Sequence, residues 1–150
     1  MGTRSRIGIE NADGTVTSVS CHWDGYLSHV GNILHTSYQT EEKIRELMGL
    51  GNLSSLGEDI GERHPFDNPY QWGTVEHEAL ERQCTFYGRD RGEPNTDARV
   101  CTNLEAYAKL RAEYTYLWKD GKWLVLGNDA DRPWLSLEEA IRMDSEEDEE

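Results

Sequence analysis

The chain has 150 residues, of which 36% are hydrophobic and 29% are charged, a composition typical of one globular domain. Fifteen Lys and Arg stand against 29 Asp and Glu, which gives a net charge of −14. This charge argues against direct binding along a nucleic-acid backbone and favours a basic partner protein. No run approaches the roughly 20 apolar residues of a membrane span, and the N-terminus lacks the layout of a signal peptide. We therefore expect a cytoplasmic protein with no membrane partner.

The first predicted element is a β-hairpin over residues 3–21. β-branched residues, among them Ile7 and Val19, flank a turn at positions 12–14, where Gly14 can adopt a positive φ. A three-residue loop pairs Ile7 with Val19, whereas a two-residue Asp-Gly turn gives a different register. The sequence leaves both registers open.

Two helices and a long connection are predicted next. Steps of three and four residues mark an apolar helical stripe at Leu27, Val30, Leu34 and Tyr38. Asp24 is the expected N-cap of this helix. A shorter helix begins after Thr40 and stops near Gly49. Residues 51–74 show little periodicity, which predicts an irregular connection of a length that is often functional.

The region from residue 83 to 108 is predicted to contain a strand, a loop and a helix. Residues 83–88 resemble a strand, and residues 89–95 form a polar loop. Thr102 and Glu105 make a capping box for a short helix.

The clearest local signal is a second hairpin over residues 112–126. Its Asp120-Gly121 turn sets Trp118 opposite Trp123, and both faces of the hairpin are apolar, so we expect it to be central. A last helix follows, capped by Ser136 and Glu139. Six acidic residues lie in the last seven positions, and this run is predicted to be disordered.

These elements predict an α+β fold with a single domain, residues 1–143, and an acidic disordered tail, residues 144–150. We expect an antiparallel sheet built from the N-terminal hairpin, the C-terminal hairpin and the middle strand. The helices are expected to pack on one face of that sheet.

The cysteines give no sign of a metal or cofactor. Cys21, Cys84 and Cys101 are an odd number at wide spacings, which is typical of reduced, buried thiols. No Cys-x2-Cys and no paired His at helical spacing accompanies them. We expect no metal, no cofactor and no catalytic residue, and therefore not an enzyme.

The arginines are the main candidates for a site. Eleven of the fifteen basic residues are Arg, and four of these lie in predicted strand or loop positions near carboxylates such as Asp24 and Asp90: Arg4, Arg6, Arg89 and Arg91. Arg forms bidentate pairs with carboxylate and with phosphate. One interpretation is a small pocket for an anionic nucleotide, and the other is internal pairing that organises the loop.

The segment CHWDGY at positions 21–26 adds aromatic and polar candidates. Trp23 or Tyr26 could stack on a nucleotide base, while His22 and Asp24 either join the site or fix the turn by hydrogen bonds. The candidate ligand-binding residues are Arg6, His22, Trp23, Asp24, Tyr26, Arg89, Asp90 and Arg91.

Five segments together resemble a family of small uncharacterised proteins of tailed bacteriophages and prophages. They are SRIGIEN at 5–11, DGTV at 13–16, CHWDGY at 21–26, SSLG at 54–57 and YGRDRGE at 87–93. The resemblance implies a viral accessory role in the cytoplasm of the infected bacterium. It carries over no catalytic residue.

Three functional hypotheses follow. The first is a non-enzymatic phage protein that inhibits a host defence system by binding a protein component, through an acidic surface that imitates DNA. The second is a sponge that sequesters an anionic nucleotide immune signal in an Arg and aromatic pocket. The third is a nucleotide-processing enzyme that uses His22 and Asp24. A homo-oligomer is compatible with each of them.

Overall fold

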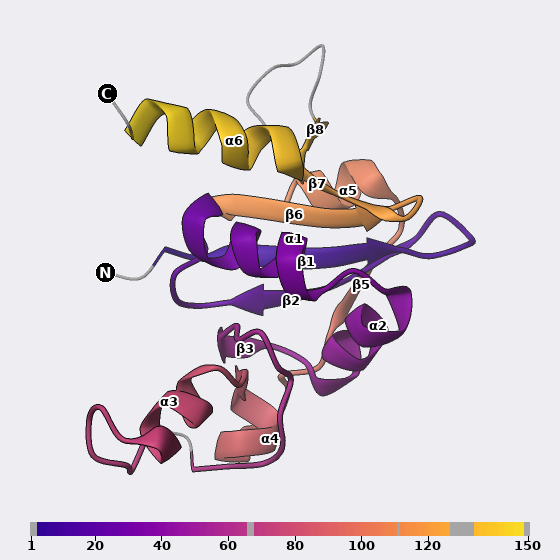
Figure 1. Cartoon of the computed structure of the whole chain (residues 1–150). Helices are drawn as coiled ribbons and strands as arrows, with labels where there is room; N and C mark the ends of the chain where they lie inside the picture. Colours follow the sequence, from indigo (N-terminus) through magenta and orange to yellow (C-terminus); the bar gives the residue numbers. More distant parts are fainter. Residues whose placement is uncertain (1–2, 66–67, 111, 127–133, 149–150) are drawn as a thin grey trace.

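The computed structural model describes residues 3–65, 68–110, 112–126 and 134–148. It shows a mixed α+β fold around one sheet (Figure 1). The strands are β1 (Ser5–Glu10), β2 (Val16–Cys21), β3 (Leu53–Ser55), β4 (Thr85–Phe86), β5 (Arg99–Cys101), β6 (Tyr114–Lys119), β7 (Lys122–Leu126) and β8 (Trp134–Ser136). Their order is β4-β3-β2-β1-β6-β7-β8, with β5 also paired to β2.

The sheet is mixed, which corrects the expectation of an antiparallel one. β1 pairs with β6 in parallel, and β2 pairs with β3 in parallel. The first of these pairs joins the two hairpins. Tyr114 enters β6 by donating its backbone N–H to the carbonyl of Arg4, which precedes β1. Both strands therefore start at the same end of the sheet, and a parallel pair results.

Both hairpins have registers that their turns explain. In the first, Asn11 donates to the carbonyl of Thr15 across a loop of three residues, and Ile7 pairs with Val19. In the second, Asp120 and Gly121 both have positive φ, 52° and 78°, as a tight hairpin turn requires. Trp118 accordingly lies opposite Trp123, and Leu117 lies opposite Leu124.

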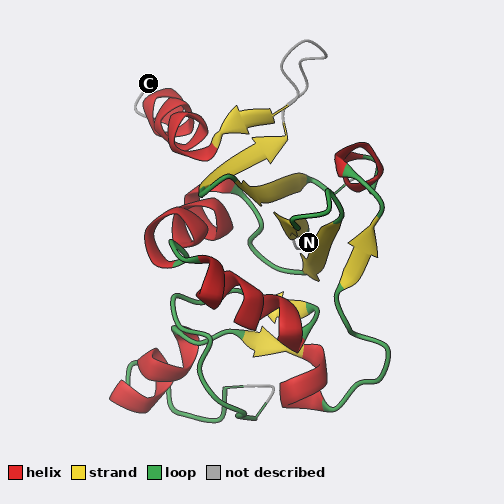
Figure 2. Cartoon of the chain, turned by 90° about the vertical axis from the view of Figure 1, so that its right-hand side faces the viewer, coloured by secondary structure: helices red, strands yellow, loops and turns green. Residues whose placement is uncertain are grey.

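The helices cover both faces of the sheet, which corrects the expectation of one covered face. They are the π-helical turn η1 (Leu27–Gly31), α1 (Asn32–Ser37), α2 (Glu41–Leu50), α3 (Val75–Glu81), α4 (Tyr87–Arg91), α5 (Leu104–Ala108) and α6 (Leu137–Asp148). Figure 2 shows α5 on the opposite side of the sheet from α1 and α2.

Two hydrophobic clusters fill these two faces. The larger one joins β1, β6 and β7 to α1, α2 and α6 through Ile7, Leu34, Ile44 and Leu137. The smaller one lies under α5 and contains Tyr107 and Leu117. Tyr107 crosses β1 at Gly8, where a Cβ atom would lie 2.7 Å from the tyrosine ring. Its hydroxyl donates to the carbonyl of Tyr116 at 2.6 Å, so Gly8 allows α5 to dock on the sheet.

Helix starts differ in detail from those predicted. Asp24 has a positive φ of 55° and does not cap a helix; Tyr26 holds the N-cap position of η1 instead. Asn103, one residue after the predicted cap, accepts a hydrogen bond from the backbone of Ala106 and caps α5. Thr40 caps α2, as its position predicts.

Two predicted segments need correction. The predicted strand 83–88 contains only the two residues of β4, because the chain enters α4 at Tyr87, so Arg89 and Asp90 lie on a helix and not in a loop. α6 continues to Asp148 and includes most of the tail that was predicted to be disordered. In the described part of the chain, no helix has both the length and the apolar character to cross a membrane.

Candidate functional site

The structure separates the residues that the sequence analysis grouped into one ligand site. Arg6 lies on β1, on the face covered by α5, and shares a pocket with His22. Asp24 lines a different pocket, next to α3. Arg89 and Asp90 lie on α4, and neither they nor Arg91 is among the described residues that line the pocket at Arg6. Among the described residues, no pocket therefore combines Arg6 with Arg89 or Arg91.

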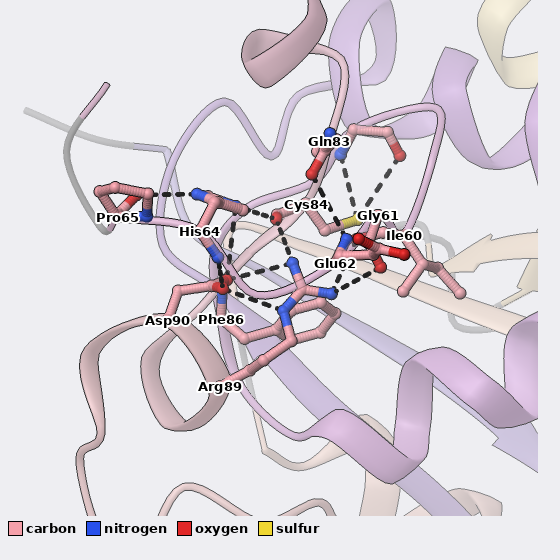
Figure 3. A network of polar contacts seen from close by, with 11 residues as sticks. Ile60, Gly61, Glu62, His64, Pro65, Gln83, Cys84, Phe86, Arg89 and Asp90 are labelled. Atoms are coloured by element: carbon pink, nitrogen blue, oxygen red, sulfur yellow. Dashed lines mark hydrogen bonds and ion pairs between the residues drawn. The ribbon is translucent and has the colours of Figure 1, made fainter. Parts of the chain in front are cut away.

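Arg89 is saturated by acceptors within the chain (Figure 3). Its Nε donates to Asp90 Oδ1 at 3.0 Å, and Nη1 donates to the carbonyls of Ile60 and Gly61, each at 3.0 Å. Nη2 donates to the carbonyl of Cys84 at 3.0 Å and to Asp90 Oδ2 at 3.2 Å. These bonds use all five N–H groups of the guanidinium, which leaves none for a ligand.

Asp90 is the buried centre of the same network. Its carboxylate accepts the backbone N–H groups of Phe86 at 2.8 Å and His64 at 3.1 Å. The His64 ring places Nδ1 2.7 Å from the carbonyl of Pro65, and Nε2 3.0 Å from that of Cys84 and 3.5 Å from Asp90. We call Arg89, Asp90 and His64 the clamp, because together they tie the loop at residues 60–65 to β4 and α4.

Beside the clamp lies a polar groove formed by two adjoining pockets. The first, of about 320 Å³, lies between the turn after β2, β3 and α3, and the second, of about 300 Å³, continues it along α3. His64, Leu80 and Gln83 line both. Four carboxylates and one guanidinium, that of Arg63, line the combined space, which we call the acidic groove; the carboxylates are those of Asp24, Glu62, Glu76 and Glu81.

Exposed aromatic rings border the acidic groove. Tyr70 lines it, and the Tyr26 ring lies 6.1 Å from that of the lining residue His29. Trp72 is 81% exposed, and its ring lies 4.7 Å from that of His77. Nε2 of His77 in turn lies 3.3 Å from Glu81, so the Trp72 ring is joined by contacts to the groove wall. Large exposed apolar side chains gathered in this way mark interaction surfaces.

Sequence reasoning missed His64, Tyr70 and Trp72. Nothing in the sequence distinguishes His64 from the other four histidines, because its partners come from residues about 20 to 26 positions away. Tyr70 and Trp72 did carry a signal. They lie in a segment without apolar periodicity, and such a segment has no regular buried face to take up two large rings.

The thiols are buried and poorly suited to nucleophilic chemistry. Burial raises the pKa of Cys21 to about 12 and also raises the pKa of Cys84. The Cys84 sulfur lies 3.2 Å from the Tyr38 hydroxyl and accepts from the backbone of Gly57 at 3.3 Å. Both thiols are therefore protonated near neutral pH and act as packing groups. Within the described residues, no three His, Cys, Asp or Glu side chains are grouped so as to hold a metal ion.

No model of a known protein family matches the chain, and comparisons with curated proteins and with solved structures find no match.

Proposed function

We propose that the protein is a non-enzymatic binding protein whose acidic groove holds a basic segment of a partner protein. The carrying observation is that negative charge and exposed aromatic rings coincide on one part of the molecule. Residues 58–82 contain seven Asp or Glu against two Arg, a net charge of −5 in 25 residues, and include Tyr70 and Trp72.

This combination suits Lys and Arg side chains. An exposed tryptophan or tyrosine face attracts a cation, and a nearby carboxylate supplies the counter-charge and accepts its hydrogen bonds. The Trp72 ring lies against the ring of His77, which in turn lies beside Glu81. Tyr70 lines the groove with Glu62 and Glu76. The net charge of −14 would also speed the encounter with a basic partner.

The clamp supports this role by holding the groove in place. Glu62 and His64 line the groove and belong to the loop that Arg89 and Asp90 tie down. A loop that is already ordered loses less conformational entropy on binding than a free one. The clamp thus provides a preorganised wall on an otherwise irregular segment.

Together with the resemblance to phage proteins, this surface supports a role as an inhibitor of a bacterial host's defence system. The partner would be a protein component with a basic surface, such as a nucleic-acid channel. The acidic groove would then take the place of the phosphates that normally fill that channel. His22 and Asp24 line separate pockets, which favours binding over the enzyme hypothesis.

The test measures binding of the full chain to a synthetic arginine-rich peptide and to proteins of a bacterial lysate, at low and high salt. The groove variant combines Trp72→Ala with Glu62→Gln and Glu76→Gln. It is expected to lose binding both to the peptide and to the lysate proteins. The control, Glu46→Gln with Glu138→Gln, removes two exposed charges elsewhere and is expected to bind like the parent. Equal binding by the groove variant and the control contradicts the proposal.

The inhibitor role is tested in cells. Bacteria carrying defence systems would express either the parent chain or the groove variant, and phage plating efficiency would be measured. The parent chain is expected to restore plating on at least one strain, and the groove variant is not. Restoration by the groove variant to the same level would mean that the acidic groove is not the inhibitory surface.

A further inference from the structure

A second pocket, on the sheet face opposite α1 and α2, has the reverse charge. It has a volume of about 310 Å³ and lies where β1 begins and β2 ends, bordered by Tyr87 of α4 and by Leu110. Its charged or titratable side chains include Arg4, Arg6 and His22, and none of the described residues that line it is Asp or Glu. In a chain of net charge −14, a pocket with this composition is the opposite of the average surface.

Arg6 is the residue of this basic pocket best placed to bind an anion. Its Nη2 donates to Ser18 Oγ at 3.0 Å, while its Nε is buried and, among the described residues, has no hydrogen-bond partner. No described carboxylate forms an ion pair with it, and another cation, Arg99, is among the groups that act on its pKa. A half-buried guanidinium without a counter-ion is less stable than a paired one, so an anion is a favourable neighbour for Arg6.

The electrostatics agree with this geometry. Burial lowers the pKa of Arg6, and the neighbouring Arg99 acts in the same direction. These two effects, which Tyr107 and Cys101 partly oppose, disfavour the positive charge, and an anion in the pocket would offset them by supplying a counter-charge. Arg99 lies on β5 opposite Ser18 of β2, so the strand register itself brings the two guanidinium groups to one face.

We propose that this basic pocket binds a small molecule through a phosphate group, with Arg6, Arg4 and His22 as the donors. Arg6 lines the pocket and its Nη2 already bonds Ser18, so the other Nη N–H groups of the guanidinium are the ones that can donate to phosphate oxygens. Arg4 is exposed and can close over the outer oxygens. Tyr87 and Leu110 give the organic part of the ligand an aromatic and an aliphatic wall.

The size of the pocket limits the ligand. Small-molecule pockets range from roughly 300 to 1,000 Å³, so this pocket lies at the lower end and suits a mononucleotide better than a dinucleotide. The site is separate from the acidic groove, since Arg4, Arg6 and His22 line only the basic pocket among the pockets described. The protein would then carry an anion site in addition to its proposed protein-binding groove.

The experiment is a thermal-shift and calorimetric titration of the full chain with inorganic phosphate, a nucleoside monophosphate, the matching cyclic nucleotide and the free nucleoside. We expect the melting temperature to rise with phosphate-bearing compounds and not with the nucleoside. A response to inorganic phosphate as strong as that to the nucleotide supports the site and assigns recognition to the phosphate alone. No response to any phosphate compound overturns the proposal.

Variants tie the response to the pocket. Arg6→Gln is expected to weaken nucleotide binding at least about tenfold, as loss of a charge-assisted hydrogen bond does. Because this variant also removes a half-buried charge that has no described counter-ion, its melting temperature without ligand should not fall below that of the parent. Arg4→Gln, at an exposed position, should weaken binding without affecting folding. Arg142→Gln on α6 is the matched control, and an equal loss in that variant would refute the site.

Discussion

The clamp and the basic pocket each contain a partly buried arginine, and the two arginines differ in how many hydrogen bonds they make. Arg89 in the clamp donates all five of its N–H groups to Asp90 and to three backbone carbonyls. Arg6 in the basic pocket makes one hydrogen bond, to Ser18, and keeps a buried Nε without a partner among the described residues. Both arginines lie near other polar groups in the sequence and both are partly buried. The degree of hydrogen-bond saturation therefore distinguishes an arginine that holds the fold from one that is available to a ligand.

The largest expected effect comes from making the same substitution at both arginines. Arg89→Gln leaves the buried carboxylate of Asp90 without its cation and should lower the free energy of unfolding by about 3 kcal/mol. Arg6→Gln should change it by less than about 1 kcal/mol. Urea denaturation followed by tryptophan fluorescence measures both. Equal destabilisation by the two variants would erase the distinction between them.

Hydrogen exchange sharpens the same comparison. In Arg89→Gln, the amides of residues 60–64 should exchange faster while those of β1 and β2 stay protected, because the clamp holds only the loop. The acidic groove should then lose affinity for the arginine-rich peptide, and the basic pocket should keep its response to nucleotide. Parallel loss of both activities would show that the two regions are coupled.

A smaller loss of stability is expected at the sheet face that carries the basic pocket. In Gly8→Ala, the new Cβ would lie 2.7 Å from the ring of Tyr107, which is wholly buried. Such overpacking should cost about 1–3 kcal/mol, measured by thermal or urea unfolding. Gly49→Ala provides the control, because a Cβ there meets no atom within 4 Å. A Gly8→Ala variant as stable as that control would mean that α5 docks without close contact.

Among these variants, Trp72→Ala should change the free energy of unfolding least, while it should still weaken binding of the arginine-rich peptide. The side chain is 81% exposed, so the free energy of unfolding should change by no more than about 0.5 kcal/mol. Affinity for the arginine-rich peptide should fall about tenfold or more, as for an aromatic residue central to an interface. Titration of the peptide against the single variant gives the result. Unchanged affinity would remove Trp72 from the binding surface.

Burial of Cys21 makes the stability of the fold depend on pH, and substitutions in the acidic groove or the basic pocket should not change this dependence. The pKa of Cys21 is raised from its ordinary value of 9.0 to about 12 by burial, so the folded state favours the protonated thiol. The resulting contribution to stability is fully present below pH 9 and is lost as the pH rises towards 12. Alkylation of the native chain at pH 8 should accordingly be slow and should accelerate on unfolding. Rapid labelling of the native chain would contradict the observed burial.

Local features of the fold could be predicted from the sequence. Asp120-Gly121 determines a hairpin because only residues tolerant of positive φ fit its turn, and Thr40 caps a helix through its own neighbouring backbone. The parallel pairing of β1 with β6 could not be predicted, since it depends on the path by which the chain returns from α5 to the start of β1. The same limit explains α4, where Asp90 helps end β4 by accepting from the backbone of Phe86.

The candidate sites were predictable only as residue types. Arg6, His22 and Arg89 were identified as polar candidates, but the residues around them come from distant segments: Ser18 bonds Arg6, Tyr87 lines the pocket with His22, and the carbonyl of Ile60 accepts from Arg89. How deeply an arginine is buried, and how many of its N–H groups are bonded, depends on these distant residues and cannot be read from the arginine's own position in the sequence. The sequence left an anion pocket and internal pairing open for these arginines, and the structure pairs Arg89 internally in the clamp and places Arg6 in a separate basic pocket.

The parallel ladder between β1 and β6 has a consequence for biosynthesis. β1 pairs Ile7 with Tyr116, so its second neighbour leaves the ribosome more than 100 residues after it does. At translation rates of about 5–20 residues per second, the nascent N-terminal hairpin waits roughly 5–20 s with that edge unpaired. Ile7 and Ile9, which end with no exposed surface, cannot complete their packing until that strand has been made. Completion of the central sheet is thus a late event during synthesis, and its timing depends on the number of residues between β1 and β6.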